Sequence, residues 1–162
     1  MGHSHDWVES LRRRIIPKLG VVTAFLEEIT GKNYYVTAET RDDQFVGCVP
    51  MGEEEFEEEL HDMGFDRNPA ASLKRHFRVG DVEECSFRKA NGDKQLHVIL
   101  YDGKEIANAD SGEVFIYAHW EYRWDKYPLK HYRGESLNFK IGVDRMRRLL
   151  EDNGIPYDHV QP

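Results

Sequence analysis

The sequence lacks the features that mark secreted and membrane proteins. Its two cysteines, Cys48 and Cys85, are too few and too far apart for a disulfide framework. We expect two reduced, buried thiols, with a single bridge as the alternative. No apolar run approaches the roughly 20 residues that span a bilayer, and the N-terminus lacks the apolar core of a secretory signal. These absences predict a soluble, cytoplasmic protein without membrane contact.

Several common catalytic signatures are missing as well. The chain contains no GxxxxGK[ST] phosphate loop, no GxGxxG dinucleotide fingerprint and no GxSxG nucleophile elbow. It also contains no HExxH or CxxC metal motif, and no HxH motif that involves the candidate site residues. We therefore expect no cofactor and no metal, and the sequence does not name its own reaction or ligand.

The composition is that of a globular protein with an uneven charge. The 162 residues are 40% hydrophobic, 12% aromatic and 32% charged, which suits a single domain over residues 1–162 with a real core. The net charge is -8, yet residues 123–148 hold eight Lys or Arg against three acids. Such a basic segment indicates either an anionic ligand or a face that docks the protein's own acidic helix.

Hydrophobic periodicity divides the chain into helical and extended segments. Helical spacing predicts helices within the first thirty residues, over 52–63, from 68 and over 144–153. Alternation predicts strands within 33–50, on both sides of Asn91-Gly92 between 82 and 101, and over 114–124, followed by a loop over 125–134. We predict an α+β fold with an antiparallel sheet of about five strands and helices packed mainly on one face.

The Asn91-Gly92 pair is a strong signal for a two-residue hairpin loop. With this loop, Phe87 faces Leu96 on the apolar side, and Arg88 and His97 lie on the other side.

The segment over 114–124 is the most informative part of the chain, because aromatic, histidine and charged residues alternate along it. One face of this strand is apolar. The opposite face carries Phe115, Tyr117, His119, Glu121 and Arg123. An antiparallel meander would place His97 on this second face, which we expect to project away from the packed interior.

The favoured function is binding, either of an anionic ligand (nucleic acid or another phosphate-bearing molecule) or of a protein partner. Aromatic rings on an open sheet face can stack bases while Lys and Arg contact phosphates. The candidate ligand-binding residues are Arg88, Tyr101, Tyr117, Lys130, His131, Tyr132 and Arg133. An exposed Trp120 or Trp124 would favour a protein partner instead, and a homodimer stays open.

The alternative function is a hydrolase-like enzyme. His119 with Glu121 would do acid–base chemistry, Arg123 would stabilise developing charge, and His97 would assist. A metal-dependent version would use His97, His119 and Glu121 as two imidazoles and one carboxylate. Such residues also commonly form cross-strand pairs with a purely structural role.

Overall fold

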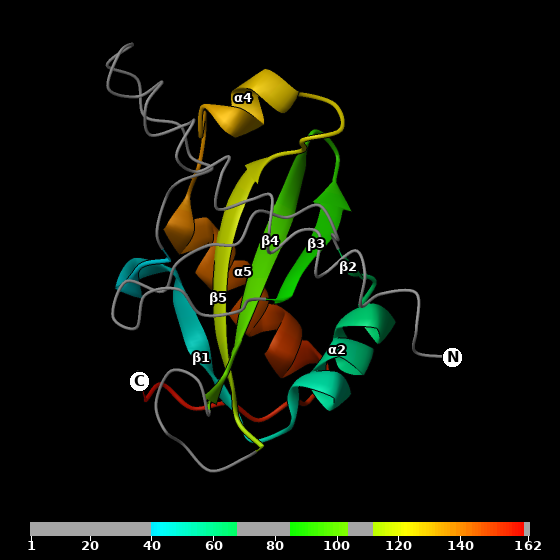
Figure 1. Ribbon diagram of the computed structural model, residues 1–162, viewed down its shortest axis with the longest axis vertical. Coiled ribbons are helices and arrows are strands. Elements are labelled where there is room, and N and C mark those ends of the chain that lie inside the picture. The colour runs from blue at the N-terminus through cyan, green and yellow to red at the C-terminus, as the bar shows by residue number, and fades with distance from the viewer. Residues whose placement is uncertain (1–39, 68–84, 104–111, 161–162) are drawn as a thin grey trace, which may run out of the picture.

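The strands form one antiparallel sheet, with helices packed against it (Figure 1). The computed structural model describes residues 40–67, 85–103 and 112–160. The sheet has the order β1-β5-β4-β3-β2. Its strands are β1 (Phe45–Val49), β2 (Asp66–Arg67), β3 (Cys85–Asn91), β4 (Lys94–Asp102) and β5 (Val114–Tyr122), and the helices are η2 (Asp42–Gln44), α2 (Glu53–Asp62), α4 (Pro128–Tyr132) and α5 (Phe139–Asp152). The predicted α+β fold is confirmed, while the helices predicted before residue 31 and from 68 lie outside the described residues.

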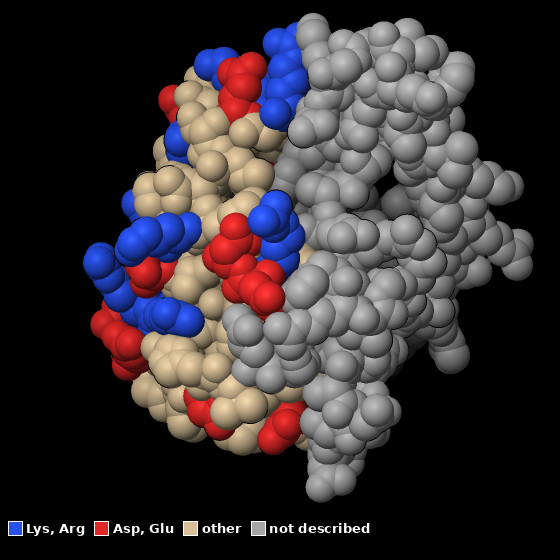
Figure 2. Space-filling view, turned by 90° about the vertical axis from the view of Figure 1, so that its left-hand side faces the viewer, with Lys and Arg blue, Asp and Glu red and all other residues tan. Residues whose placement is uncertain are grey.

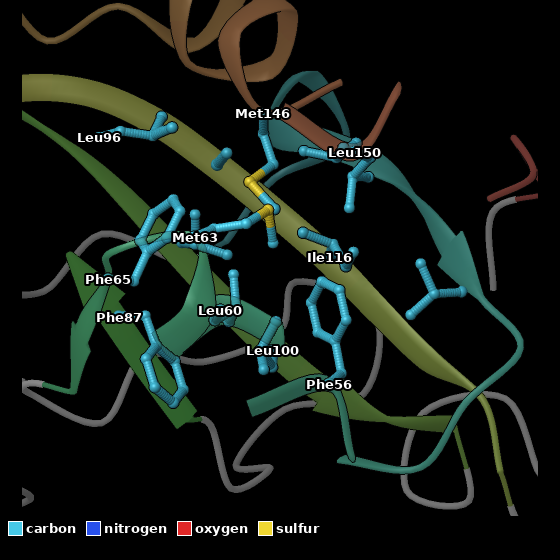
Figure 3. Packing of buried hydrophobic residues seen from close by; sticks show 14 of the residues in the cluster. Phe56, Leu60, Met63, Phe65, Phe87, Leu96, Leu100, Ile116, Met146 and Leu150 are labelled. Atoms are coloured by element: carbon cyan, nitrogen blue, oxygen red, sulfur yellow. The ribbon is translucent and has the colours of Figure 1, made fainter. Parts of the chain in front are cut away.

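The main core lies between the sheet and the two longer helices, α2 and α5. Phe56 and Leu60 of α2 meet Met146 and Leu150 of α5 over Ile116 of β5, and all five are fully buried (Figure 3). Fully burying one such side chain contributes about 1.5–3 kcal/mol relative to leaving it exposed. These contacts place α2 and α5 on the same side of the sheet, as the periodicity predicted.

The β3–β4 hairpin has a different register from the one that Asn91-Gly92 predicted. The loop is Gly92-Asp93, so Asn91 faces Lys94 and Phe87 faces Val98. Gly92 has a φ of 63°, and a loop that needs positive φ at its first position selects glycine there. The shift moves each partner by two residues, so the division between the two faces of the hairpin is preserved.

Two helical boundaries also differ from the prediction. The expected loop over 125–134 contains the short helix α4, which begins at Pro128, a residue that suits the first helical position. Helix α5 begins at Phe139 instead of residue 144, because the Asn138 side chain accepts a hydrogen bond from the Ile141 N–H and caps the helix.

Gly142 explains how closely α5 approaches the sheet. A Cβ atom at this position would lie 2.2 Å from the His119 Cα atom, so only glycine lets the helix pack here. The start of α5 therefore sits directly against the part of β5 that carries the histidine.

Neither cysteine forms a disulfide: both thiols are free, and each is half-buried rather than fully buried as expected. Within the described residues, no helix is long and apolar enough to cross a membrane.

Candidate functional site

Strands β4 and β5 bring the predicted catalytic residues together. His97 pairs with His119, and Gln95 pairs with Glu121. The pleat of β5 places Phe115, Tyr117, His119 and Glu121 on one face, as predicted. The expectation that this face is open was wrong, because His97, His119 and Glu121 are 3%, 0% and 1% exposed. We call these three residues the histidine–glutamate cluster.

The Glu121 carboxylate is the centre of the cluster. Its Oε1 atom lies 3.1 Å from Nδ1 of His97 and accepts a hydrogen bond from Nε2 of Gln95 at 2.9 Å. Its Oε2 atom lies 3.4 Å from Nε2 of His119 and 3.2 Å from Nδ1 of His131 in α4. Three imidazoles from three elements therefore converge on one buried carboxylate.

The outer ring nitrogens of the two strand histidines have their own partners. Nε2 of His97 is hydrogen-bonded to Oγ of Ser86 on β3, and Nδ1 of His119 lies 3.3 Å from Oε1 of Gln44 in η2. A histidine ring with a partner at both nitrogens is held in one orientation. The cluster is therefore a built arrangement with little rotational freedom.

Burial and proximity set the charge states within the cluster. The pKa of His97 lies well below its usual range, mainly because the ring is buried and secondly because of the electrostatic effect of His119. The imidazole is therefore neutral. Burial alone would raise the pKa of Glu121, but electrostatic attraction to His119 and the hydrogen bond with His97 outweigh it. The pKa of this carboxyl therefore lies well below its usual range, and Glu121 is ionised at neutral pH.

The aromatic residues of the same face form a second, smaller core. Tyr101, Phe115 and Tyr117 are at most 4% exposed and pack with Phe45 and Ile99. The Tyr101 and Tyr117 rings meet edge to face at 5.5 Å. These rings cannot stack on a base in this structure, so the predicted role of Tyr101 and Tyr117 as an open platform needs correction.

The exposed aromatic and basic residues gather at the far end of β5 instead. The ammonium groups of Lys94 and Lys130 lie 4.9 Å and 4.8 Å from the centre of the Tyr122 ring, and Lys130 also lies 5.1 Å from that of Tyr127. Trp124 is 48% exposed, and the Arg88 guanidinium lies 6.0 Å from its ring centre. We call this surface the basic–aromatic end, made of Arg88, Lys94, Tyr122, Trp124, Tyr127 and Lys130.

The remaining predicted residues divide between these two regions and the open surface. His131 belongs beside the cluster, since it contacts Glu121 and the Tyr122 carbonyl. Arg123 follows the end of β5 and donates to Asp125, and Arg133 lies 3.7 Å from Glu135. The side chain of Tyr132 lies outside the described part of the structure. Arg123 thus has a carboxylate partner apart from the predicted His119–Glu121 pair.

Two of the surface hollows bear on the predicted hydrolase-like activity, because an enzyme needs a hollow for its substrate beside the catalytic residues. One of about 460 Å³ lies beside α5, and its described lining includes Asp42, Lys140 and Arg147. Figure 2 looks onto this side of the molecule, where basic and acidic atoms are intermingled. The other lies by Cys48 and Tyr157. Neither has a cluster residue among its described lining, so catalysis by His119 and Glu121 stays a prediction.

Sequence reasoning missed several partners that the fold supplies. Gln44, Gln95 and Ser86 support the cluster, yet a single polar residue in a strand or turn gives no sequence signal for such a role. Gln95 could have been found, because the hairpin predicted from Asn91-Gly92 already places it on the same face as His97.

No protein family model matches the chain, and neither the curated proteins nor the solved structures contain a match.

Proposed function

We propose that the protein binds single-stranded nucleic acid through the basic–aromatic end. The proposal rests on the ammonium groups of Lys94 and Lys130, which both lie over the ring of Tyr122, close to the half-exposed side chain of Trp124. A single strand offers bases that stack on aromatic rings and phosphates that pair with cations, which is the chemistry of this surface.

The location at the end of the sheet follows from burial. A macromolecular ligand can reach only exposed groups, and Tyr101, Tyr117 and the histidine–glutamate cluster are buried. Trp124 and Lys130, in contrast, are exposed, and Tyr122 and Tyr127 are half-exposed. The predicted binding residues that fit this function are therefore Arg88 and Lys130, joined by Lys94 and the three rings.

The charge balance predicts modest affinity. The protein as a whole carries a net charge of -8, which repels a polyanion. At the binding surface, Asp93 and Asp125 already pair with Lys126 and Arg123. We expect contacts with about three phosphates and a dissociation constant in the range of non-specific binders, about 1–100 μM at physiological salt.

Fluorescence anisotropy with a labelled oligothymidylate tests the proposal on the full chain. Affinity should fall about twentyfold between roughly 50 and 200 mM salt, because each of about three phosphate contacts contributes a slope of about -0.7 for a single strand. A Lys94→Gln/Lys130→Gln double variant should bind about tenfold more weakly, with a shallower salt slope.

The matched control is a Lys140→Gln/Arg148→Gln double variant on α5. It makes the same change of net charge at two exposed positions away from the basic–aromatic end, so it should leave affinity nearly unchanged. If both double variants weaken binding equally, or if the wild type does not bind at low salt, the proposal fails.

A second candidate is a protein partner, favoured by the exposure of two large apolar side chains in this region. Trp124 is 48% exposed and Leu129 is 67% exposed, and tryptophan is enriched at interface hot spots. The simplest such partner is a second copy of this chain. Sedimentation velocity over a concentration series should then show self-association that Trp124→Ser reduces, whereas a monomer at all concentrations would exclude the homodimer.

A further inference from the structure

We propose that the histidine–glutamate cluster binds one divalent transition metal ion, of the class that contains zinc, iron(II) and cobalt(II). The ligands would be Nδ1 of His97, Nε2 of His119 and the carboxylate of Glu121. Two imidazoles and one carboxylate form a ligand set common to zinc and non-haem iron sites. This proposal is independent of the nucleic-acid function and departs from the expectation that no metal is bound.

The spacing of the donor atoms fits a metal centre. One ligand atom from each of the three residues can be chosen so that all three lie within 4.8 Å of one another. Two of the separations are 3.1 Å and 3.4 Å, between Glu121 and the two histidines. Tetrahedral ligands about 2.0–2.2 Å from a zinc ion lie roughly 3.3–3.5 Å apart, so a small adjustment would admit an ion.

The Gln44 contact identifies the donor atom of His119. If Oε1 of Gln44 accepts the proton on Nδ1, a neutral His119 has an unprotonated Nε2, and this nitrogen lies 3.4 Å from Oε2 of Glu121. Oε2 is buried and lacks a hydrogen bond of normal geometry among the described residues. Two facing acceptors in a buried place repel each other unless a cation or a proton lies between them.

The surrounding hydrogen bonds match the outer sphere of a metal site. Metal-binding histidines almost always donate their second ring nitrogen to a nearby acceptor, and binding carboxylates are themselves hydrogen-bonded. Here Ser86 contacts the second nitrogen of His97, Gln44 contacts that of His119, and Gln95 donates to Glu121. Each of the three ligands therefore has an orienting partner from a neighbouring element.

His131 lies on the α4 side of the cluster, with its Nδ1 atom 3.2 Å from Oε2 of Glu121. Its side chain is 17% exposed, whereas His97 and His119 are at most 3% exposed. We therefore expect an ion to reach the cluster from the α4 side.

The competing interpretation is a metal-free network in which a proton on His119 occupies the space between Nε2 and Oε2. Both interpretations use the same residues, and they differ in whether the intact cluster responds to a metal. The decisive experiment therefore leaves the cluster unchanged.

That experiment uses the full chain with His3→Ala and His5→Ala, so that the N-terminal histidines do not bind the probe. The protein is stripped with a chelator, titrated with Zn²⁺ or Co²⁺, and desalted. We expect one ion per chain, visible absorption from the Co²⁺ form, and Zn²⁺-induced shifts of the imidazole nitrogen resonances of His97 and His119. Unchanged resonances for these two histidines at excess Zn²⁺ would overturn the proposal, even if ions are retained elsewhere.

Substitutions then assign the ligands. His119→Gln and Glu121→Gln should each lower Zn²⁺ affinity at least about 100-fold, and Ser86→Ala should lower it about tenfold through loss of orientation. His159→Gln is the control, since this exposed histidine lies in the C-terminal segment and should have no effect. Circular dichroism separates loss of binding from loss of folding, and equal affinity of the Glu121 and His159 variants would contradict the assignment.

Discussion

The histidine–glutamate cluster and the basic–aromatic end are built on the same two strands, yet they offer opposite chemistry. His119 and Tyr122 are three residues apart on β5, and His97 and Lys94 are three apart on β4. His119 is fully buried and faces a buried carboxylate, whereas Tyr122 is half-exposed and lies beside two lysines. Burial, more than residue type, separates the proposed site for a small cation from the proposed surface for a large anion.

The energetic consequences differ in the same way. Inside the cluster, losing one partner leaves a buried charge or a buried donor without compensation, which is costly. At the basic–aromatic end, water replaces any lost contact, and exposed cation–π pairs contribute only about 0.5–1 kcal/mol. Substitutions in the first region should therefore change stability, and substitutions in the second should change binding.

The largest expected effect comes from removing the centre of the cluster. Glu121→Ala leaves His97 and Gln95 without their common acceptor, and each buried polar group left unsatisfied costs about 1–3 kcal/mol. Chemical denaturation with a chelator present measures this loss of unfolding free energy. Glu135→Ala removes an exposed carboxylate and should change stability by less than about 0.5 kcal/mol; similar losses for both variants would remove the distinction between the two regions.

The next effect tests the packing that holds β5 in place. Gly142→Ala puts a Cβ atom against the His119 backbone, so α5 must move away from β5. We expect a loss of about 2–3 kcal/mol, slightly offset by the better helix propensity of alanine. Denaturation curves measure it, with Gly52→Ala as the control because a Cβ there meets no atom within 4 Å. Oligonucleotide binding should be retained under conditions where the variant is folded.

The sequence was sufficient to predict the sheet and the face of β5 on which each residue lies. Alternation over 114–122 fixes that face because the strand period is two, and it correctly grouped His119 with Glu121. The antiparallel meander predicted that His97 lies on the same face, whereas its position opposite His119 is a finding of the structure. Local pattern is enough for these features because they depend only on backbone geometry.

The sequence could not predict which side of the sheet is closed. His, Glu and Tyr are compatible with an exposed face, and the burial of Tyr101 and Tyr117 depends on tertiary packing. The register of the β3–β4 hairpin was also predicted wrongly. Both Asn91-Gly92 and Gly92-Asp93 are favourable two-residue loops, and the choice between them depends on the remaining contacts between the strands. Asn138 did offer a local signal for the start of α5, as a favourable N-cap residue.

The pH dependence of stability should include a contribution from the buried cluster. His97 has a pKa below its unfolded value of about 6.5, so below that pH the unfolded chain binds a proton that the folded cluster excludes. Glu121 has a pKa below its unfolded value of about 4.5 and acts in the same direction in more acidic solution. Unfolding free energy should therefore fall by up to about 1.4 kcal/mol per pH unit for each proton on acidification below about pH 6.5.

This prediction is checked by denaturation at a series of pH values with a chelator present. His97→Gln should flatten the slope between about pH 6.5 and 4.5, since glutamine does not titrate. A slope that is identical in the wild type and the variant would show that His97 is not the titrating group.

The smallest expected effect on stability is at the basic–aromatic end. Lys130→Gln removes the cation that lies over both Tyr122 and Tyr127, yet this exposed contact contributes no more than about 1 kcal/mol. The same change should weaken oligonucleotide binding several-fold, because one of the cations that pair with phosphates is lost. Parallel denaturation and anisotropy measurements on Lys130→Gln and the control Lys140→Gln separate the two effects. A large loss of stability without a loss of binding would mean that the exposed end, like the cluster, serves the fold.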